Sequence, residues 1–338
     1  MKNEIYEYPE ITGKIVNNVG PGWMMLERFT REYDQRFHLE EILTMGMAIF
    51  LNVLIVTFSD IRLAPHIFLL NSGIVALVLL VNYMNRTINN TTYSTFRDWY
   101  VAILLLIIYM EHNTLVPLIN ATDIDSIIIK IDRILFLGND PTILLERFTH
   151  PVITEILQAV YVSFYFLPFL LVLLLYMKGR KIDFHILAST ILLGFFISYI
   201  GYYIFPAIGP RFTLDHLQAV PLTGIFTFDF FRGFIFKAGG ITRDCFPSGH
   251  TLISALTVML SYKYYRRFAP LSFIWGTLLI ISTVYLRYHY VADLVAGFII
   301  AVVVYRYGPT LARFYIFGSE YYAEQPAGEN LRSTWWRM

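Results

Sequence analysis

Two short polar stretches of this chain carry residue types that can perform acid–base and nucleophilic chemistry. One is Pro-Ser-Gly-His at residues 247–250, which opens an apolar segment. The other contains Arg287, His289 and Asp293 at the start of a second apolar segment, 39 residues beyond the first histidine. If both segments are membrane helices that begin on one side, two imidazoles and a carboxylate meet at a membrane surface. Such a set suits the cleavage of a phosphate ester.

Residues 247–250 also have the features of an anion-binding helix start. Ser248 is a favourable N-cap residue, and the backbone amides that follow it are unpaired donors. These donors and the helix dipole attract phosphate. Gly249 lets a phosphate approach the backbone because it has no Cβ. We therefore expect Ser248 and Gly249 to bind phosphate, with His250 close to it in the first turn.

The second stretch predicts a nucleophile. His289 and Asp293 are four residues apart, a spacing that places both side chains on one face of a helix. A carboxylate that accepts a hydrogen bond from one imidazole nitrogen fixes the tautomer and makes the other nitrogen more nucleophilic. We predict His289, Asp293 and His250 as catalytic residues. Arg287 and Arg211 carry planar sets of donors that suit the non-bridging oxygens of phosphate.

The composition places these residues in a membrane protein. Of 338 residues, 56% are hydrophobic and 15% are charged, and the mean hydropathy is +0.55. Soluble domains are nearer a quarter charged. The net charge of +1 gives no reason to expect a nucleic-acid partner. The single cysteine, Cys245, excludes an intrachain disulfide, and the polar N-terminal region lacks the pattern of a cleavable signal peptide.

Apolar segments long enough to cross a bilayer predict an all-α, polytopic membrane helix bundle with about eight transmembrane helices. We place these helices at about residues 42–59, 63–85, 99–119, 151–177, 184–206, 248–263, 268–286 and 291–307. The predicted domains are an N-terminal segment (1–41), two additional transmembrane helices (42–98), a six-helix catalytic core (99–310) and a C-terminal tail (311–338).

The charges of the loops predict an orientation. With eight spans, both termini lie on one face, and the short loops of that face hold most of the basic residues: Arg86, Arg97, Lys178, Arg180, Lys181, Lys263, Arg266 and Arg267. The short loops of the other face hold only Arg62 and Arg287. Because basic loops stay in the cytoplasm, we expect cytoplasmic termini. Both polar stretches then face the extracytoplasmic side, periplasmic or lumenal.

Two long connections are expected on that outer side. Residues 120–150 alternate charged and Ile-rich positions, which predicts an amphipathic helix on the membrane surface. The second is residues 207–246, and its stretch from 226 to 236 contains six phenylalanines (Phe226, Phe228, Phe230, Phe231, Phe234 and Phe236). Long loops are often lids or binding loops, so this one shapes a lipid entrance or acts as an interfacial anchor.

Other ionisable residues lie within or near the predicted membrane spans. Glu111 and His112 lie well into the third segment. They bind a substrate headgroup or relay a proton if they face the bundle interior, and they lie in water if the segment ends at Met110. We interpret the remaining histidines as polar residues at the membrane interface: His38, His66, His150, His185 and His216.

Residues 245–251 (Cys-Phe-Pro-Ser-Gly-His-Thr) and 282–293 (Ser-Thr-Val-Tyr-Leu-Arg-Tyr-His-Tyr-Val-Ala-Asp) resemble the second and third signature blocks of the type 2 phosphatidic acid phosphatase (PAP2) superfamily. The resemblance implies a six-helix core, an outward active site and no metal or other cofactor. It implies that His289 attacks phosphorus to give a phosphohistidine, that Asp293 orients it, and that His250 protonates the leaving oxygen. The implied partners are the bilayer and a lipid phosphate or phospholipid substrate.

The chain departs from that family pattern in two places. Where the third block usually has an arginine, six residues before the nucleophilic histidine, this chain has Thr283. The first block has no clear match, and the nearest feature is Gly-Pro-Arg-Phe at residues 209–212. The third block looks like the branch of inositol phosphorylceramide synthases and related bacterial proteins, which transfer headgroups between lipids. Pro-Ser-Gly-His is similar to the phosphatase branch, so hydrolase and transferase both stay open.

Three functions of other classes are alternatives to this prediction. Two histidines and a carboxylate also suit zinc, which predicts a metal-dependent hydrolase that is sensitive to EDTA. A lipid transporter is a second alternative, but the sequence lacks the inverted repeats that transporters often have. A non-catalytic scaffold is the third, and the intact set of two histidines and an aspartate argues against it.

Overall fold

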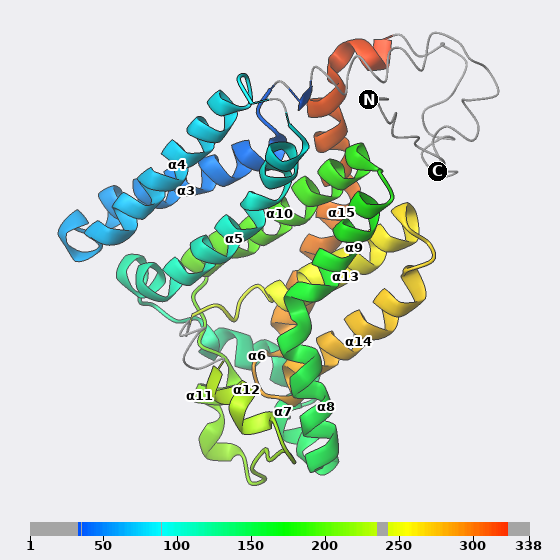
Figure 1. Ribbon diagram of the computed structural model, residues 1–338. Coiled ribbons are helices and arrows are strands. Elements are labelled where there is room, and N and C mark those ends of the chain that lie inside the picture. The colour runs from blue at the N-terminus through cyan, green and yellow to red at the C-terminus, as the bar shows by residue number, and fades with distance from the viewer. Residues whose placement is uncertain (1–32, 35, 89, 235–242, 324–338) are drawn as a thin grey trace.

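A computed structural model describes residues 33–34, 36–88, 90–234 and 243–323 of the chain (Figure 1). Within these residues the protein is helical and has no β-strand, so the all-α prediction is confirmed. Most of the expected N-terminal segment, the end of the C-terminal tail and Phe236 of the Phe-rich loop lie outside the described residues.

Six helical segments of the described chain are long and apolar enough to cross a membrane, which makes this a multi-pass membrane protein. They are α3 (Leu39–Phe58), α4 (Pro65–Met84), α5 (Thr91–Ile119), the continuous α8–η3–α9 segment (Pro151–Val162, Ser163–Tyr165, Phe166–Met177), α10 (Lys181–Ile204) and α15 (Val291–Ala323). A short 3₁₀ turn, η1 (Ile61–Leu63), joins α3 to α4.

Two further apolar helices, α13 (Gly249–Tyr264) and α14 (Ala269–Tyr285), fall where the sequence predicts the sixth and seventh spans. They have 16 and 17 residues, which corresponds to roughly 24 and 26 Å at 1.5 Å per residue. A bilayer core is about 30 Å thick. The predicted number of eight full spans is therefore not established, although all eight predicted segments are helices.

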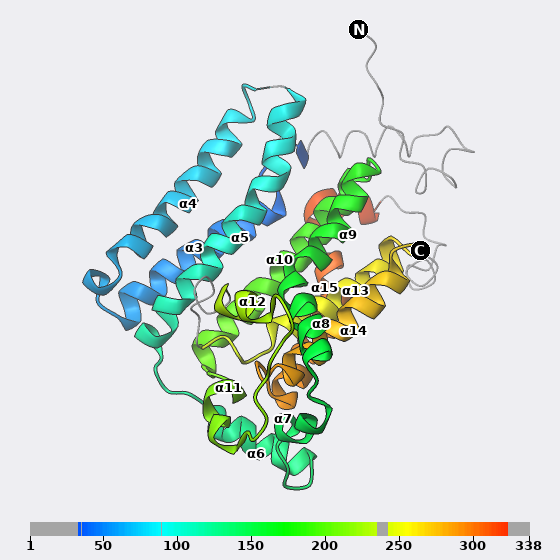
Figure 2. The same ribbon diagram turned by 60° about the horizontal axis from the view of Figure 1, so that its bottom comes forward.

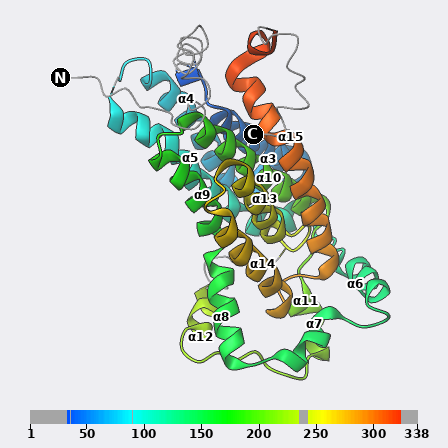
Figure 3. The same cartoon turned by 90° about the vertical axis from the view of Figure 1, so that its right-hand side faces the viewer.

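Helix α13 lies inside the bundle, where it packs against α9, α10, α14 and α15 (Figures 1 and 3). Helices α3 and α4 form a pair on one side and contact the core through α5 and α10 (Figures 1 and 2). Helix α15 approaches the start of α13 closely because residue 297 is glycine. A Cβ there would lie 2.5 Å from the Ser248 carbonyl oxygen, which no other side chain tolerates.

Short helices gather at one end of the bundle, next to the starts of α13 and α15 (Figures 2 and 3). They are α6 (Asp125–Leu135), α7 (Pro141–Leu144), η2 (Leu145–Phe148), α11 (Pro210–Thr213), η4 (Asp215–Leu217) and α12 (Phe228–Phe234). Helix α6 is the amphipathic helix predicted for residues 120–150. It buries Asp125, Ile128 and Asp132 and leaves Ile131 and Ile134 exposed.

Candidate active site

Two helix starts meet at the site and are joined through the backbone. Ser248 is the N-cap of α13, and its Oγ accepts a hydrogen bond from the Thr251 amide at 3.2 Å. The Ser248 amide donates to the Asp293 carbonyl oxygen at 3.2 Å, in the first turn of α15. Residues that lie 45 positions apart in sequence are thereby fixed relative to each other.

The turn between α14 and α15 is held by an αL C-cap. The Tyr288 amide donates to the Thr283 carbonyl and the Arg287 amide to the Val284 carbonyl, which is the Schellman pattern. Arg287 occupies the left-handed position with φ +66°, where a residue with a Cβ costs roughly 1–2 kcal/mol. This turn places His289 two residues before the first residue of α15.

His289 contacts both other predicted catalytic residues. Its Nδ1 lies 3.0 Å from Asp293 Oδ2 and 3.1 Å from the Cys245 carbonyl oxygen. Both of these atoms can only accept, so Nδ1 carries the proton and Nε2 has the lone pair. The Nε2 atom lies 3.3 Å from Nδ1 of His250. The structure therefore brings His250, His289 and Asp293 together, with the lone pair of His289 Nε2 directed toward His250.

The sequence predicts that His289 and Asp293 share one face of a helix. In the structure only Asp293 lies in α15, and His289 lies in the turn before it. As the third residue of the helix, Asp293 accepts a hydrogen bond from the Tyr290 amide at 3.3 Å through the same Oδ2 atom. A carboxylate at this position satisfies donors of the helix start. One carboxylate thus caps the helix and orients the histidine.

Cys245 is a member of the site that the sequence did not identify. Its Sγ donates to Asp293 Oδ2 at 2.8 Å, and the side chain is buried. Burial and the neighbouring Asp293 carboxylate raise the pKa of the Cys245 thiol well above its ordinary value, so the thiol stays protonated as a donor. Donor atoms of Cys245, His289 and Asp293 lie within 4.8 Å of one another, as a metal site would also require.

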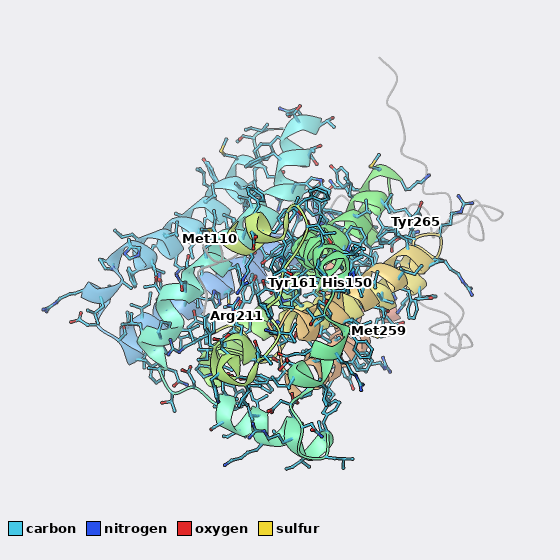
Figure 4. All side chains as sticks on the ribbon, turned by 90° about the horizontal axis from the view of Figure 1, so that it is seen from below. Met110, His150, Tyr161, Arg211, Met259 and Tyr265 are labelled. Atoms are coloured by element: carbon cyan, nitrogen blue, oxygen red, sulfur yellow. The ribbon has the colours of Figure 1, made fainter. Side chains whose placement is uncertain are left out.

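A stack of aromatic rings leads from His250 to Arg211 and was also not predicted. The Tyr161 ring stacks on His250 at 4.5 Å and on Tyr288 at 4.4 Å between centroids. The Arg211 guanidinium lies 5.1 Å from the centroid of Tyr288. Seen from this end of the bundle, Tyr161 and Arg211 are near the middle of the molecule (Figure 4). The Phe164 ring also packs against His250, with 4.3 Å between the ring centroids.

Arg287 is directed away from the two histidines, into the outer loops. Its guanidinium donates to Gln218 Oε1 at 2.7 Å and to the Val220 carbonyl oxygen, and it forms an ion pair with Glu146 at 3.1 Å. These contacts come from the segment between α10 and α12 and from η2. In this arrangement Arg287 fixes the outer loops, and the stack brings Arg211 closer to His250.

Gly249 is required by packing. A Cβ on it would lie 2.8 Å from the Tyr202 hydroxyl and 3.0 Å from Ser198 Oγ, both on α10. The sequence analysis expects glycine at position 249 for another reason, the close approach of a phosphate to the backbone, and the packing against α10 leaves that expectation untested.

Glu111 and His112 lie inside the bundle, because α5 continues to Ile119 and both side chains are buried. The interpretation that they lie in water beyond Met110 is wrong. Glu111 Oε2 accepts from Asn71 Nδ2 at 2.8 Å, and His112 Nδ1 lies 2.8 Å from the Ile108 carbonyl oxygen. Glu111 thus contacts α4, whereas the His112 ring packs against Tyr199 and Tyr203 of α10.

Two carboxylates of the outer helix α6 accept hydrogen bonds from the segments that form the site. Asp132 accepts hydrogen bonds from the Val291 and Ala292 amides at 2.9 and 2.7 Å, and so caps the start of α15. Asp125 accepts from the Gly209 amide at 2.9 Å and from the Tyr290 hydroxyl at 2.7 Å. The two carboxylates connect α6 to the loops that carry Arg211 and His289.

A family model described as the PAP2 superfamily matches residues 126–307. This range covers more than half of the chain and contains both polar stretches. The chain belongs to the PAP2 superfamily. The match and the apolar helices together make this PAP2 protein a membrane protein of a phosphatase family.

The PAP2 chain is also similar to a PA-phosphatase related-family protein of Dictyostelium discoideum, with 33% identity over 117 residues. That alignment covers 34% of this chain and 21% of the relative, so the chain spans about a fifth of the relative's length. No solved structure matches the chain. These matches support the PAP2 superfamily as a whole and do not extend to the inositol phosphorylceramide synthase branch.

Proposed function

We propose that this PAP2 protein transfers the phosphoryl group of a lipid phosphate or pyrophosphate through a phosphohistidine at His289. The observation that carries the proposal is the arrangement of His289, whose protonated Nδ1 meets Asp293 while Nε2 faces His250 at 3.3 Å. A histidine with one nitrogen anchored by a carboxylate is an activated nucleophile. The second histidine lies where a proton donor is needed.

In the first step, His289 Nε2 forms a bond to phosphorus and the bond from phosphorus to the lipid oxygen breaks. A proton from His250 goes to the leaving oxygen. In the second step, the oxygen of water or of an alcohol attacks the phosphohistidine, its proton goes to His250, and the N–P bond breaks. Because His250 directly contacts Nε2, substrate must first separate the two rings.

The remaining charge of the phosphoryl group is bound by donors near the start of α13. The helix start at Ser248 and Gly249 directs amides and a dipole toward this position. Arg211, at the far end of the ring stack, supplies a guanidinium. A polar cavity of about 170 Å³ next to Tyr288, lined by Arg211, Arg232 and Arg287, suits a headgroup with further negative charge.

The lipid chain is proposed to lie in an apolar cavity of about 420 Å³ between α5, α9 and α10. Its lining is mostly hydrophobic and includes Tyr165 and Phe195, and it also contains Glu40 and Asp98, which lie toward the opposite end of the bundle. The rings of Tyr165 and Phe195 contact Phe164, which packs on His250. The cavity therefore leads from the membrane-spanning helices toward the histidine pair.

The test is purified protein supplied with a lipid phosphate monoester, a prenyl pyrophosphate and a phospholipid with a ceramide acceptor. Free phosphate and new lipid product are counted in the same reaction. We expect phosphate release from the first two, and a headgroup transferase would instead form new lipid without stoichiometric phosphate. His250→Ala and His289→Ala should abolish turnover while the melting temperature stays near that of the wild type. Full activity of either variant contradicts the proposal.

A further inference from the structure

A second cluster of histidines and carboxylates lies at the opposite end of the bundle. His38 directly precedes α3, and His185 lies near the start of α10. From His185 to the end of α10 at Ile204 the helix rises roughly 29 Å, at 1.5 Å per residue. The cluster is thus about one bilayer thickness from the active site. These two histidines were expected as polar residues at the membrane interface, and both side chains are buried within the protein, with exposed fractions of 2% and 1%.

Three imidazole nitrogens of this cluster are buried without a hydrogen bond. In the part of the chain that the structure describes, neither Nδ1 nor Nε2 of His38 has a partner, nor does Nε2 of His185. The two rings lie against each other at 4.4 Å between centroids. A buried polar atom without a partner costs about 1–3 kcal/mol. Three such nitrogens in one cluster indicate that a ligand other than the protein chain binds them.

The donor atoms have the spacing of a metal site. One atom each from Asp34, His38 and His185 lie within 4.8 Å of one another. The closest approach of His38 Nε2 to Asp34 Oδ1 is 3.9 Å. Ligands of a tetrahedral zinc ion, at 2.0–2.1 Å from the metal, are separated by roughly 3.3 Å. A small inward movement would bring these three atoms to bonding distance.

The surroundings of His185 have the form expected around a metal ligand. Its Nδ1 lies 2.5 Å from Glu40 Oε1, and the other Glu40 oxygen accepts from Ser189 Oγ at 2.8 Å. Metal-bound histidines almost always donate their second nitrogen to a carboxylate or a carbonyl, which fixes the tautomer. The other nitrogen, His185 Nε2, lies 3.5 Å from Asp98 Oδ1 and forms no hydrogen bond in the described part of the chain, so it can turn to a metal.

The charges favour a divalent cation. Lys181 Nζ lies 3.5 Å from Asp34 Oδ1 and 3.6 Å from Asp98 Oδ2. With neutral imidazoles, the carboxylates of Asp34, Asp98 and Glu40 exceed this one ammonium group by two negative charges. Buried charge without compensation is expensive. A divalent ion would neutralise the cluster, and the Asp34 side chain, which is 43% exposed, offers a route from water.

We propose that Asp34, His38 and His185 bind a divalent transition-metal ion. Two imidazoles and one carboxylate, with water as the fourth ligand, suit Zn²⁺ best. The ion would tie the residues before α3 to α10, and its role is structural because it lies far from the histidine pair. This site is independent of the proposed phosphoryl transfer.

The experiment measures metal content of the full-length protein, purified with a tag that contains no histidine from cells grown with zinc. Mass spectrometry of the elements should find about one zinc per chain. His38→Ala and His185→Gln should lose it, and His289→Asn and Cys245→Ser should retain it, because those two residues belong to the other cluster of possible ligands. Loss of zinc in the last two variants, with retention in the first two, overturns the proposal.

A second measurement covers the case in which the His38 and His185 variants do not fold. EDTA should lower the melting temperature of the wild-type protein, and added Zn²⁺ should restore it while Mg²⁺ does not. Wild-type protein that holds no zinc and shows no response to EDTA or Zn²⁺ contradicts a metal site.

Discussion

At the scale of single residues, the properties of His289 follow from its neighbours. Two acceptors, Asp293 Oδ2 and the Cys245 carbonyl, surround Nδ1 and hold the ring in one tautomer. The thiol of Cys245 donates to the same carboxylate oxygen. Asp293 therefore receives hydrogen bonds from a histidine, a thiol and a helix amide, so its orientation is fixed before substrate arrives.

Two substitutions distinguish the effect of the Asp293 charge from the effect of the hydrogen bond that Cys245 donates to it. Asp293→Asn keeps the shape but removes the charge that stabilises His289, and we expect kcat to fall by roughly 10²–10⁴-fold, the scale of losing the carboxylate partner of a catalytic histidine. Cys245→Ser keeps a donor to Asp293, and its effect should stay below roughly tenfold, the value of about one neutral hydrogen bond. Steady-state kinetics of the purified variants measure both, and equal effects would contradict the assigned roles.

Residue types and spacing were sufficient to predict His250, His289 and Asp293 as a group. They were not sufficient for Tyr161, because it lies on a helix distant in sequence and carries no local signal. Nor could they show that Arg287 turns outward, since that depends on the αL conformation at the end of α14. Burial of His38 and His185 depends on the packing of α3 against α10, which no spacing reveals.

At the scale of elements, α6 acts as a support for the catalytic turn. Its buried face presents Asp125 and Asp132 to the loop at Gly209 and to the start of α15. Apolar runs in the sequence predicted the positions of the long helices and of α6 itself. They could not predict that a carboxylate of α6 caps α15, because helix capping across 159 residues leaves no pattern in the sequence.

The Asp132 cap predicts a dependence of stability on pH. Burial raises the pKa of Asp132 to about 6, although the hydrogen bonds from the Val291 and Ala292 amides act in the opposite direction. A carboxyl group with a raised pKa in the folded state contributes stability that is fully present below its ordinary pKa of 3.8. That contribution is lost as the pH rises through about 6.

The Asp132→Asn variant lacks this titration. The melting temperature of the wild-type protein, measured relative to that of Asp132→Asn in the same detergent, should therefore increase as the pH is lowered from 7 to 4.5. All other titrating groups are common to both proteins and cancel in the comparison. A difference that is the same at both pH values would show that Asp132 keeps an ordinary pKa, and a change in the opposite direction would show that folding lowers it; either result contradicts the prediction.

At the scale of the whole molecule, the two ends of the bundle differ in character. One end has the histidine pair and the short outer helices. The other has the turn between α9 and α10, where Arg180 donates to the Tyr264 carbonyl at the end of α13, and Arg313 of α15 reaches the Tyr264 hydroxyl. Most basic residues of the short connections between membrane helices, such as Lys178, Arg180 and Arg266, lie at this second end. Under the positive-inside rule we therefore expect this end to be cytoplasmic.

Labelling of single cysteines tests this orientation. In a Cys245→Ser background, Asn139→Cys is exposed just after α6 and Lys178→Cys is exposed after α9. A maleimide that cannot cross membranes should label position 139 in intact cells and position 178 only after permeabilisation. The reverse pattern would place the histidine pair on the cytoplasmic side.

The all-α membrane architecture was predictable because long apolar runs have few alternatives in a bilayer. The number of helices that cross the whole bilayer was harder to predict. Helices α13 and α14 are short, and how deeply they enter the membrane depends on the helices that pack around them. The same holds for the lipid cavity, which is formed by side chains of three helices that are distant in sequence.

The most direct test of phosphoryl transfer is to trap the phosphorylated enzyme. Purified protein is mixed with a radiolabelled lipid phosphate, quenched within milliseconds to seconds, and analysed by mass spectrometry under alkaline conditions that preserve phosphohistidine. We expect an acid-labile phosphoryl group on His289 of the wild-type protein and none on the His289→Asn variant. A phosphoryl group on another residue, or full turnover by His289→Asn without any phosphorylated enzyme, would contradict the proposal.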